Sequence, residues 1–511
     1  MPPDLPATYY LDNVRTLFRH VENVYADILD SECLQFLNDF DQLGDDAQKL
    51  LVRLLNRTNT LFRQSKLNYA EIESVASAVR ELESHSFIEI NPKLESEQIL
   101  PLFNKTELIR HHHDTASLKN LKRAELDNYL IDQSDADFFK KLHKTECFIS
   151  ITRQDIYQIL QMIFFGNLNQ SMTDFVLRDL GLYQYENYRI DFDNRPYRET
   201  GDIQIHWLLH QLETCLQLLD PDDKETLLDC SRAIPDCAPQ QSSLFRKSDR
   251  LRFKIARQLE RIGELGPAMT LYRQCQLPPS RERRARIYHQ QKDLEAALNL
   301  CCEIIDSPID DAELQFAMSF ASRLSRQHKM APPAGIESQQ KCQPEIICLE
   351  LAKHSSVEHA VVEYYQQQQP GQACFYLENS LFNSVFGLLI WDAIYAPVAG
   401  AFYNPFQYRP SDFYDYDFVE KRLSIFEEIW SSINNNNDIR RHVSDYWNRK
   451  QGIANPLVDW YRINPELIDL ALKRIPYKHW MTIFERQLRD LRNNRSGFPD
   501  LVVFPPDDGY L

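Results

Sequence analysis

The sequence predicts a mainly α-helical protein that is divided into several domains. Long segments place apolar residues at the spacing of amphipathic helices, and only 13 glycines interrupt the 511 residues. At the usual domain size, this length corresponds to roughly three or four domains. The hydrophobic content of 43% and the charged content of 26% are those of an ordinary globular protein. The predicted parts are residues 1–96, 97–200, 201–370 and 371–511.

The first part, residues 1–96, is predicted to consist of helices. Within it, the segment 49–66, KLLVRLLNRTNTLFRQSK, carries five basic residues and no acidic residue. Basic residues recur every four positions and leucines occupy another face, which predicts one helix with a cationic ridge on its outer side. The ridge residues are Lys49, Arg53 and Arg57.

Residues 97–132 predict a compact unit of two helices. Thr106 with Glu107 can start the first helix, and Ser117 can cap the second. The unit also carries a basic patch between residues 105 and 123. The apolar positions of the second helix are Leu118, Leu121, Leu126 and Leu130, and the patch includes Lys105, Arg110, Lys119, Lys122 and Arg123.

A short run of histidines, His111 to His113, precedes Asp114 and raises the question of a metal site. Three adjacent histidines cannot all face one ion from a helix. The preferred interpretation is therefore a solvated turn.

Paired helices are predicted between residues 203 and 330. The segments LERIGELGPAMTLYRQCQLPPS and IYHQQKDLEAALNLCCEIIDSP each place a small residue, Ala268 or Ala297, where two helices can approach closely. The repeat spacing resembles that of tetratricopeptide-type hairpins, although it is short of the usual period. The segment QQQQPGQ at 366–372 predicts a linker after these hairpins.

A buried helix is predicted from the segment FYLENSLFNSVFGLLIWD, because Leu381 to Trp391 is almost wholly apolar. Glu378 lies at the N-terminal edge of this helix. It can be a first-turn acid that complements the helix dipole. It can also be a metal carboxylate held on a rigid core helix, and the local sequence slightly favours the first interpretation.

The segment RSGFPDLVVF predicts a short buried strand at 501–504 with Asp500 directly before it. A carboxylate next to a buried strand is costly unless it is paired or binds a cation. Gly-Phe-Pro-Asp is also good turn chemistry, so Asp500 can simply belong to a turn. The segment alone leaves both interpretations open.

The formal net charge of -17 argues against nucleic acid as a partner, but binding to phosphates depends on local patches. Residues 246–292 hold 13 basic residues against 4 acidic ones, including Arg281 and Arg284 in the run RERRAR. Arg486, Arg489, Arg492 and Arg495 recur every three residues and predict a stripe on one helix. Each patch is either a solvated face or a DNA-binding surface.

Several classes of protein are disfavoured. No run of about 18 apolar residues predicts a membrane span, and the N-terminus lacks the pattern of a secretion signal. Eleven cysteines occur without any Cys-x-x-Cys, which disfavours a zinc cluster and fits reduced thiols of a cytoplasmic protein.

The motifs together resemble a known family. GFPDLVVF resembles the first half of the VRR-NUC core, a branch of the PD-(D/E)xK superfamily, and GLLIWD with Glu378 ahead of it resembles the preceding helix of the Fanconi-associated nuclease family. Other parts of the chain follow the order of that family, namely the segments YYLDNVRTLF and DDAQKLLVRLLNRTNTLFR, the unit at 97–132 and the helical hairpins. The unit at 97–132 is similar to a SAP DNA-binding module. The resemblance covers nearly the whole chain, and the lack of a zinc-finger extension makes it similar to bacterial members.

The resemblance implies a structure-selective, metal-dependent DNA nuclease. Such an enzyme cuts near 5′ flaps, trims DNA from 5′ ends and serves interstrand cross-link repair, with branched or 5′-flap double-stranded DNA as its partner. The C-terminal part, residues 371–511, would be an α/β nuclease core. The resemblance also implies a bacterial, nucleoid-associated location, and it leaves open whether two chains act on DNA as a homodimer.

The same resemblance assigns roles to residues. Glu378 and Asp500 would be the catalytic carboxylates that hold Mg²⁺ or Mn²⁺, because hard cations prefer carboxylate oxygens. Arg492 and Arg495 would grip the DNA backbone. Further backbone contacts would come from the basic residues of the other patches, namely Lys49, Arg53, Arg57, Lys119, Lys122, Arg123, Arg281 and Arg284.

One departure from the family pattern affects these expectations. The family places a Glu-x-Lys motif on the next strand, and no Lys, Arg, Glu or His follows Asp500 in this sequence. We therefore expect that the chain continues beyond Leu511 in a longer protein. As written, the core would be incomplete, the strand at 501–504 would have an open apolar edge, and the chain would bind branched DNA but cut it poorly.

Two other functions stay open. The missing lysine favours a catalytically disarmed DNA-repair scaffold. The hairpins and the net acidity favour a tetratricopeptide-type protein-interaction module. Salt-dependent affinity for flap DNA distinguishes the protein-interaction module from the nuclease and the scaffold. Metal-dependent cleavage distinguishes the disarmed scaffold from the nuclease.

Overall fold

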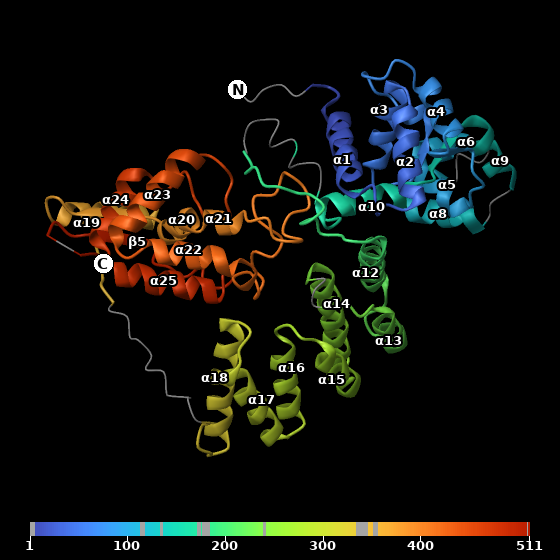
Figure 1. The fold of residues 1–511 in the computed structure, drawn as a ribbon. Helices are drawn as coiled ribbons and strands as arrows, with labels where there is room; N and C mark the ends of the chain where they lie inside the picture. Colours follow the sequence, from blue (N-terminus) through green and yellow to red (C-terminus); the bar gives the residue numbers. More distant parts are fainter. Residues whose placement is uncertain are drawn as a thin grey trace. The chain divides into compact units, whose positions relative to one another are not determined.

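The computed structural model describes residues 6–112, 118–132, 136–170, 175, 184–238, 242–333, 346–350, 356–507 and 509–511. It divides into two compact units, Met1–Leu182 and Tyr183–Leu511 (Figure 1). Helices dominate both units, which confirms the predicted fold class. The finer divisions after residues 96, 200 and 370 stay predictions.

The first unit combines helices with a small antiparallel sheet of order β1-β3-β2. The strands are β1 (Leu61–Arg63), β2 (Ile88–Ile90) and β3 (Phe148–Ile151). The helices are α1 (Tyr9–Tyr25), α2 (Ser31–Gln42), α3 (Asp45–Leu55), α4 (Val75–Ser84), α5 (Ser96–Ile99), α6 (Lys105–His111), α8 (Arg123–Asp132), α9 (Ala136–Thr145) and α10 (Gln154–Phe165), with 3₁₀ turns η1 (Gln64–Lys66) and η2 (Leu100–Leu102).

The prediction of one helix over residues 49–66 is wrong. Helix α3 ends at Leu55, and the same segment then forms strand β1, whose Phe62 lies opposite Ile149 of β3. Phe62 is buried in this position. Pairing with a strand far away in the sequence thus replaces the helix that the basic spacing suggested.

The unit at 97–132 has its own small core. Helix α6 begins at Lys105, where Asn104 and Glu107 form a capping box, so Asn104 rather than Thr106 starts the helix. The predicted apolar residues Leu118, Leu126 and Leu130 are buried, and Leu121 packs against them. The predicted cap Ser117, together with His113 and Asp114, lies outside the described residues.

The second unit begins with a row of paired helices, as predicted. Ala268 and Ala297 are fully buried where these helices meet. Figure 1 shows α14 to α18 following one another side by side. The helices are α12 (Thr200–Leu218), α13 (Lys224–Ala233), α14 (Ser242–Arg261), α15 (Leu265–Gln274), α16 (Ser280–Gln290), α17 (Leu294–Asp306) and α18 (Asp311–Gln327).

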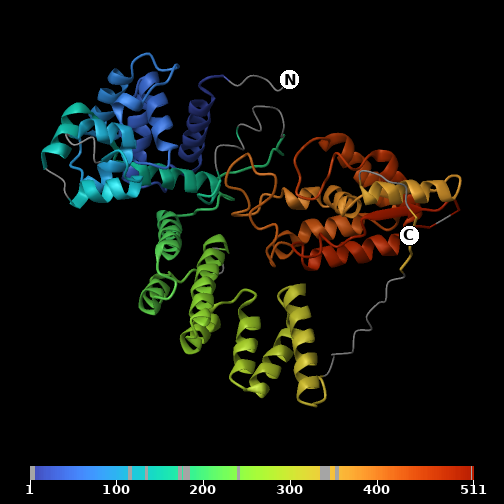
Figure 2. The same ribbon diagram turned by 180° about the vertical axis from the view of Figure 1, so that it is seen from behind.

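The rest of the second unit contains a two-stranded antiparallel sheet of β4 (Ala373–Tyr376) and β5 (Leu501–Phe504). Helix α19 (Val357–Gln368) lies against both strands (Figure 2). The predicted strand at 501–504 is therefore confirmed. The remaining helices are α20 (Ser380–Leu389), α21 (Trp391–Ile394), η3 (Glu420–Arg422), α22 (Leu423–Ser432), α23 (Asn436–Lys450), α24 (Pro465–Arg474) and α25 (Tyr477–Arg489).

The segment 366–372 is not a linker. Helix α19 continues through Gln368, and Gly371, with a φ of +87°, turns the chain directly into β4. The Gln366 side chain donates to the carbonyl of Cys374 at 3.1 Å, and that of Gln372 donates to the carbonyl of Tyr365 at 2.6 Å. The glutamines that suggested a flexible linker therefore fasten a tight turn.

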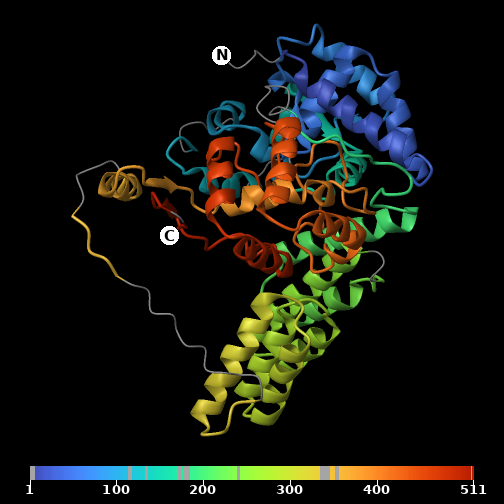
Figure 3. The same ribbon diagram turned by 60° about the vertical axis from the view of Figure 1, so that its left-hand side comes forward.

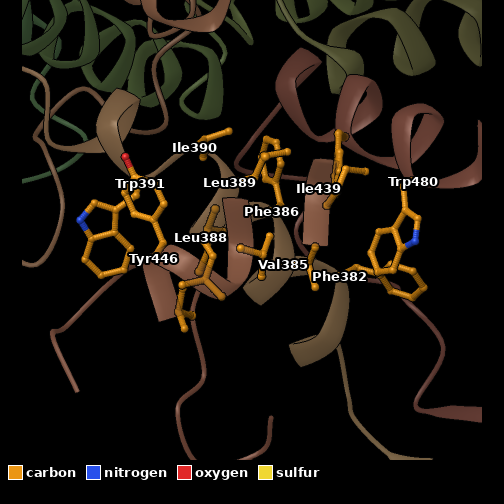
Figure 4. Packing of buried hydrophobic residues seen from close by; sticks show 14 of the residues in the cluster. Phe382, Val385, Phe386, Leu388, Leu389, Ile390, Trp391, Ile439, Tyr446 and Trp480 are labelled. Carbon is orange, nitrogen blue, oxygen red and sulfur yellow. The ribbon is translucent and has the colours of Figure 1, made fainter. Parts of the chain in front are cut away.

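Helix α20 is buried in the hydrophobic core of this part of the chain, as its apolar sequence predicted. Figure 4 shows Phe382 beside Trp480, with ring centroids 5.3 Å apart, and Val385, Phe386 and Leu389 in the same cluster. Gly387 lies at a tight contact of the helix, because a Cβ added there would lie 2.8 Å from the Cβ of Leu457. Dense packing of this kind fixes the position of the helix.

The outer edge of β5 is paired at one residue, where the prediction expected an open edge. Val503 and Leu511 exchange two backbone hydrogen bonds of 2.9 Å, so the last residue pairs with the strand on the side opposite β4. Figure 3 shows the C-terminus beside β5.

Two findings concern the described residues of both units. No helix among them is both long and apolar enough to cross a lipid bilayer. The cysteines among them are free, and burial raises the pKa of the Cys33, Cys275 and Cys301 thiols. Such thiols behave as small apolar side chains rather than as reactive groups.

Candidate active site

Glu378 and Asp500, the residues of the two predicted metal carboxylates, are joined through their backbones at one end of the β4–β5 sheet. Tyr376 lies opposite Leu501, and the pairing continues one residue further. The carbonyl oxygen of Asp500 accepts hydrogen bonds from the backbone N–H of Leu377 at 2.8 Å and of Glu378 at 3.3 Å. The antiparallel register thus brings Glu378 and Asp500 together, although they are far apart in the sequence.

A left-handed turn presents Glu378. Its φ is +35° and that of Asn379 is +66°, and such values are uncommon for residues other than glycine. The side-chain oxygen of Asn379 accepts from the backbone N–H of Phe498 at 2.9 Å, which ties the turn to the segment before Asp500. Two such residues cost on the order of 1–3 kcal/mol each, and strain of this kind concentrates at functional sites.

Glu378 is held as a carboxylate by two neighbours. Its Oε2 atom lies 2.7 Å from Nη1 of Arg462 and accepts a hydrogen bond of 3.0 Å from the hydroxyl of Tyr376. The Arg462 hydrogen bond, helped by that of Tyr376, holds the pKa of Glu378 below its usual range. Glu378 and Asp500 are both exposed, so their oxygens are accessible from solvent.

The pair fits part of a divalent-cation site. Mg²⁺ and Mn²⁺ prefer hard oxygen ligands, and two accessible carboxylates supply them. Within the described ranges, no group of three His, Cys, Asp or Glu side chains is arranged to hold a metal. Glu378 and Asp500 thus offer two carboxylates of suitable chemistry, and their role as ligands stays a prediction.

The four arginines at 486–495 do not form one helical stripe. Helix α25 ends at Arg489, because the Asp490 side chain accepts hydrogen bonds from the backbone and side chain of Asn493 and starts a turn. Arg492 and Arg495 lie in these turns and are exposed. Their guanidinium carbons lie 5.6 Å and 5.0 Å from the ring centroid of Tyr414.

Arg492 also lines a cavity of about 310 Å³ between the helical repeats and the C-terminal helices of the second unit. Arg246 and Asp415 form a buried ion pair of 2.9 Å in its wall. Burial and the nearby arginines lower the pKa of Arg250. The charged residues of the lining are Arg246, Arg250, Arg489, Arg492, Glu282, Asp310, Glu313, Asp415 and Asp490.

The predicted ridge of the first unit is largely neutralised. Lys49 pairs with Asp45 at 2.7 Å, and Arg53 pairs with Glu71 at 2.6 Å. Arg57 follows the end of α3 and is exposed near the ring of Phe62. The role of these residues in DNA binding stays a prediction.

The basic residues of the unit at 97–132 differ in their surroundings. Arg123 pairs with Asp127 at 2.8 Å and donates to the carbonyls of Leu100 and Phe103, so it stabilises the local fold. Lys119 and Lys122 are exposed. The side chains of these two lysines are therefore accessible to a phosphate backbone.

The run RERRAR lies on α16. Arg281 pairs with the buried Glu313 of α18 at 2.5 Å, which joins two helices of the row. Arg284 is half-buried, and its buried Nε has no hydrogen-bond partner among the described residues. As DNA contacts, both residues remain predictions.

Sequence reasoning missed Arg462 and the cavity arginines Arg246 and Arg250. Arg462 stands alone in the segment WYRI, where neither spacing nor charge marks it. Arg246 and Arg250 belong to a basic segment in which no pattern distinguishes the residues that line a cavity.

Comparisons with known proteins agree with this architecture. The family model described as "FAN1, HTH domain" matches residues 8–89, and that described as "VRR-NUC domain" matches residues 434–510. A protein of Pseudomonas aeruginosa named Fanconi-associated nuclease 1 homolog is 33% identical, covering 99% of this chain and 89% of its own length. The Arabidopsis thaliana homolog is 22% identical, and this chain spans 62% of it.

A solved structure is similar over nearly the whole chain. It is described as the crystal structure of paFAN1 bound to 5′-flap DNA with a 2-nucleotide flap and a gap. The two chains superimpose with a TM-score of 0.83 at 31% identity, covering 99% of this chain and 92% of the other.

Proposed function

Because the chain belongs to the Fanconi-associated nuclease 1 family, we propose that it cuts branched DNA beside 5′ flaps, with Glu378 and Asp500 as ligands of a catalytic Mg²⁺ or Mn²⁺. Membership of this family makes the protein a structure-selective, metal-dependent DNA nuclease. Trimming from 5′ ends and a role in interstrand cross-link repair belong to the same proposal.

The observation that carries the assignment of the site is the junction between Asp500 and the turn at Glu378. Backbone hydrogen bonds of 2.8 Å and 3.3 Å to the Asp500 carbonyl leave both carboxyl side chains at the same end of the sheet. A rigid sheet and a buried helix thus hold two accessible carboxylates. Such an arrangement is what a hydrolytic metal site requires of its supporting residues.

The chemistry follows from these positions. When bound, the divalent cation neutralises charge on the scissile phosphate and activates water. Glu378 and Asp500 would hold the cation, and Arg492 and Arg495 would bind backbone phosphates near it. Because arginine forms two parallel hydrogen bonds to a phosphate, these residues would also orient the strand.

The distal basic residues would contact the DNA arms with unequal strength. Lys119 and Lys122 are exposed and can approach phosphates directly. Arg53 and Arg281 are engaged by Glu71 and Glu313, so a DNA contact would have to share or break those ion pairs. We also include Lys49, Arg57, Arg123 and Arg284 as contacts of the duplex arms.

The finer parts of the proposal concern the metal, the location and the assembly. We propose Mg²⁺ or Mn²⁺ as the metal, the bacterial nucleoid as the location, and a homodimer on DNA as a state to be tested. Sedimentation of the protein with one equivalent of flap DNA distinguishes one chain from two on each DNA.

The test is cleavage of a labelled 5′-flap duplex in Mn²⁺ by the wild type and by Asp500→Ala and Glu378→Ala. In a protein that carries the family's Glu-x-Lys strand, we expect the wild type to cut and each variant to lose at least a hundredfold in rate, because each removes a cation ligand. Asp507→Asn, which changes an exposed acid just after the same strand, is the matched control. Equal rates in Asp500→Ala and the wild type would refute the site.

A second candidate function is a DNA-binding scaffold that does not cut. It is favoured by the observation that the described residues offer two carboxylates but no group of three metal ligands. Tight, salt-dependent binding of flap DNA without cleavage by the wild type, in either Mg²⁺ or Mn²⁺, would select this function.

A further inference from the structure

A turn beside Glu378 exposes a tyrosine next to an arginine. Tyr461 is 97% exposed, whereas aromatic side chains usually bury most of their surface. The following residue, Arg462, places its Nη1 atom 2.7 Å from Oε2 of Glu378. The turn Asp459–Arg462 therefore combines an exposed ring with a guanidinium at the candidate metal carboxylate.

Asp459 and α20 hold this turn in a fixed conformation. The Oδ1 atom of Asp459 accepts from the backbone N–H of Tyr461 at 3.1 Å and of Arg462 at 3.2 Å. Its Oδ2 atom accepts from Ser380 at 3.1 Å, and its backbone N–H donates to the Ser384 hydroxyl at 3.0 Å. The exposure of Tyr461 is therefore a property of an anchored turn and not of a loose loop.

We propose that the turn Asp459–Arg462 is a nucleotide-binding element, in which Tyr461 stacks on an unpaired base and Arg462 binds the adjacent phosphate beside Glu378. The inference rests on the proposed nuclease function and adds a means of recognising the branch. Stacking on an aromatic ring requires a base whose face is free, and every base offers the same π face. Such a contact selects unpaired DNA without selecting a sequence.

Arg462 can contact Glu378 and a DNA phosphate at the same time. In the free protein its guanidinium pairs with Glu378 and lies 3.8 Å from Asp459. The guanidinium has five N–H donors, and the Arg462 side chain is 42% exposed. It can thus keep its bond to Glu378 and donate to a phosphate from the solvent side. Arg462 is a substrate-binding residue in this proposal.

The stacking partner is tested with 2-aminopurine placed in the flap strand next to the branch, in EDTA so that no cleavage occurs. We expect the wild type and Tyr461→Phe to change the fluorescence of the probe on binding. Tyr461→Ala and Tyr461→Leu should not, because neither has an aromatic ring. Their Kd for flap DNA should rise about tenfold, which is typical of the loss of one stacked base.

The matched control is Tyr408→Ala, which removes another exposed tyrosine, one whose ring lies beside Arg409. This variant should bind flap DNA with the Kd of the wild type and give the same change in 2-aminopurine fluorescence. If Tyr461→Ala behaves like the wild type while the wild type cuts flap DNA in Mn²⁺, the inference is overturned and the nuclease function stands. A wild type that shows the Tyr461-dependent signal but never cuts supports the inference and refutes the nuclease function.

The phosphate contact is tested by the salt dependence of flap binding. Arg462→Ala should reduce the magnitude of the slope of log K against log salt by about 0.7, the value for one lost phosphate contact in single-stranded DNA, and Arg462→Lys should retain the slope. An unchanged slope in Arg462→Ala, with only a lower melting temperature, would mean that Arg462 acts solely as the partner of Glu378 and would overturn its assignment.

Discussion

Individual residues in this protein show why a basic side chain is a weak indicator of DNA binding. Arg63 is nearly buried and contacts Glu107 and Glu146 at 2.9 Å each, with its guanidinium 3.9 Å from the Phe103 ring centroid. Arg281 is engaged in the same way by the buried Glu313. In a chain with 74 acidic residues, many arginines serve to neutralise buried carboxylates.

Glu107 predicts a pH-dependent contribution to the stability of the first unit. Burial raises its pKa, but hydrogen bonds from Lys66, the Asn104 backbone and Arg63 lower it more, to about 2. Because the folded pKa lies below the unfolded one, the stabilisation is complete above about pH 4.5 and disappears as the pH falls towards 2. Allowing for solvent screening, we expect about 1–2 kcal/mol.

The measurement is the free energy of unfolding of the wild type and Glu107→Gln between pH 7 and pH 3. The difference should be largest at pH 7 and shrink on acidification. A difference that does not change with pH would show that Glu107 acts through shape rather than charge.

Arg281 and Arg284 are neighbours that should respond differently to substitution. Arg281→Ala leaves the buried Glu313 carboxylate unpaired, so we expect a loss of about 3–5 kcal/mol of stability. Arg284→Ala removes no ion pair among the described residues and should affect flap-DNA affinity more than melting temperature. Urea unfolding and flap binding measured on both variants distinguish the two roles. Equal stability losses would contradict this division.

At the scale of elements, the end of the β4–β5 sheet and helix α20 fix the positions of Glu378 and Asp500. Helix α20 was predictable because a long and almost wholly apolar run favours a buried helix, and β5 was predictable from its flanking turn residues. The pairing of β1 with β3 and the contact of Arg462 with Glu378 were not, because both join segments that are distant in sequence. The approach of Asp500 to Glu378 followed only from the family resemblance.

Gly387 predicts how sensitive α20 is to a single methyl group. In Gly387→Ala the new Cβ would lie 2.8 Å from the Cβ of Leu457, so the helix or its neighbour must move. We expect a loss of about 1–3 kcal/mol and weaker flap cleavage, since Glu378 precedes the same helix. Gly266→Ala in α15 meets no atom within 4 Å and should be neutral or slightly stabilising. Equal melting temperatures of the two variants would contradict the tight packing.

At the scale of the whole molecule, a net charge of -17 coexists with binding to a polyanion. Accessible cations, rather than the total charge, should therefore set the salt dependence of binding. The acidic remainder would repel DNA from other surfaces and sharpen the choice of the binding face.

Lys119 and Lys122 provide the test of this view. The double variant Lys119→Ala/Lys122→Ala should reduce the slope of log K against log salt by about 1.8, because two phosphate contacts are lost. Lys93→Ala, which changes an exposed lysine of the first unit outside the predicted patch, should leave the slope unchanged. If both variants bind flap DNA like the wild type, the unit at 97–132 does not contact the DNA arms.

The way Asp500 is built into the sheet has a practical consequence. Its backbone carbonyl fastens the turn at Glu378, whereas its side chain is exposed and makes no hydrogen bond or ion pair with the described residues. Replacing that side chain should therefore abolish DNA cleavage while leaving the fold intact. Such a variant would serve as a capture reagent, holding branched DNA from cell extracts long enough for the bound junctions to be sequenced.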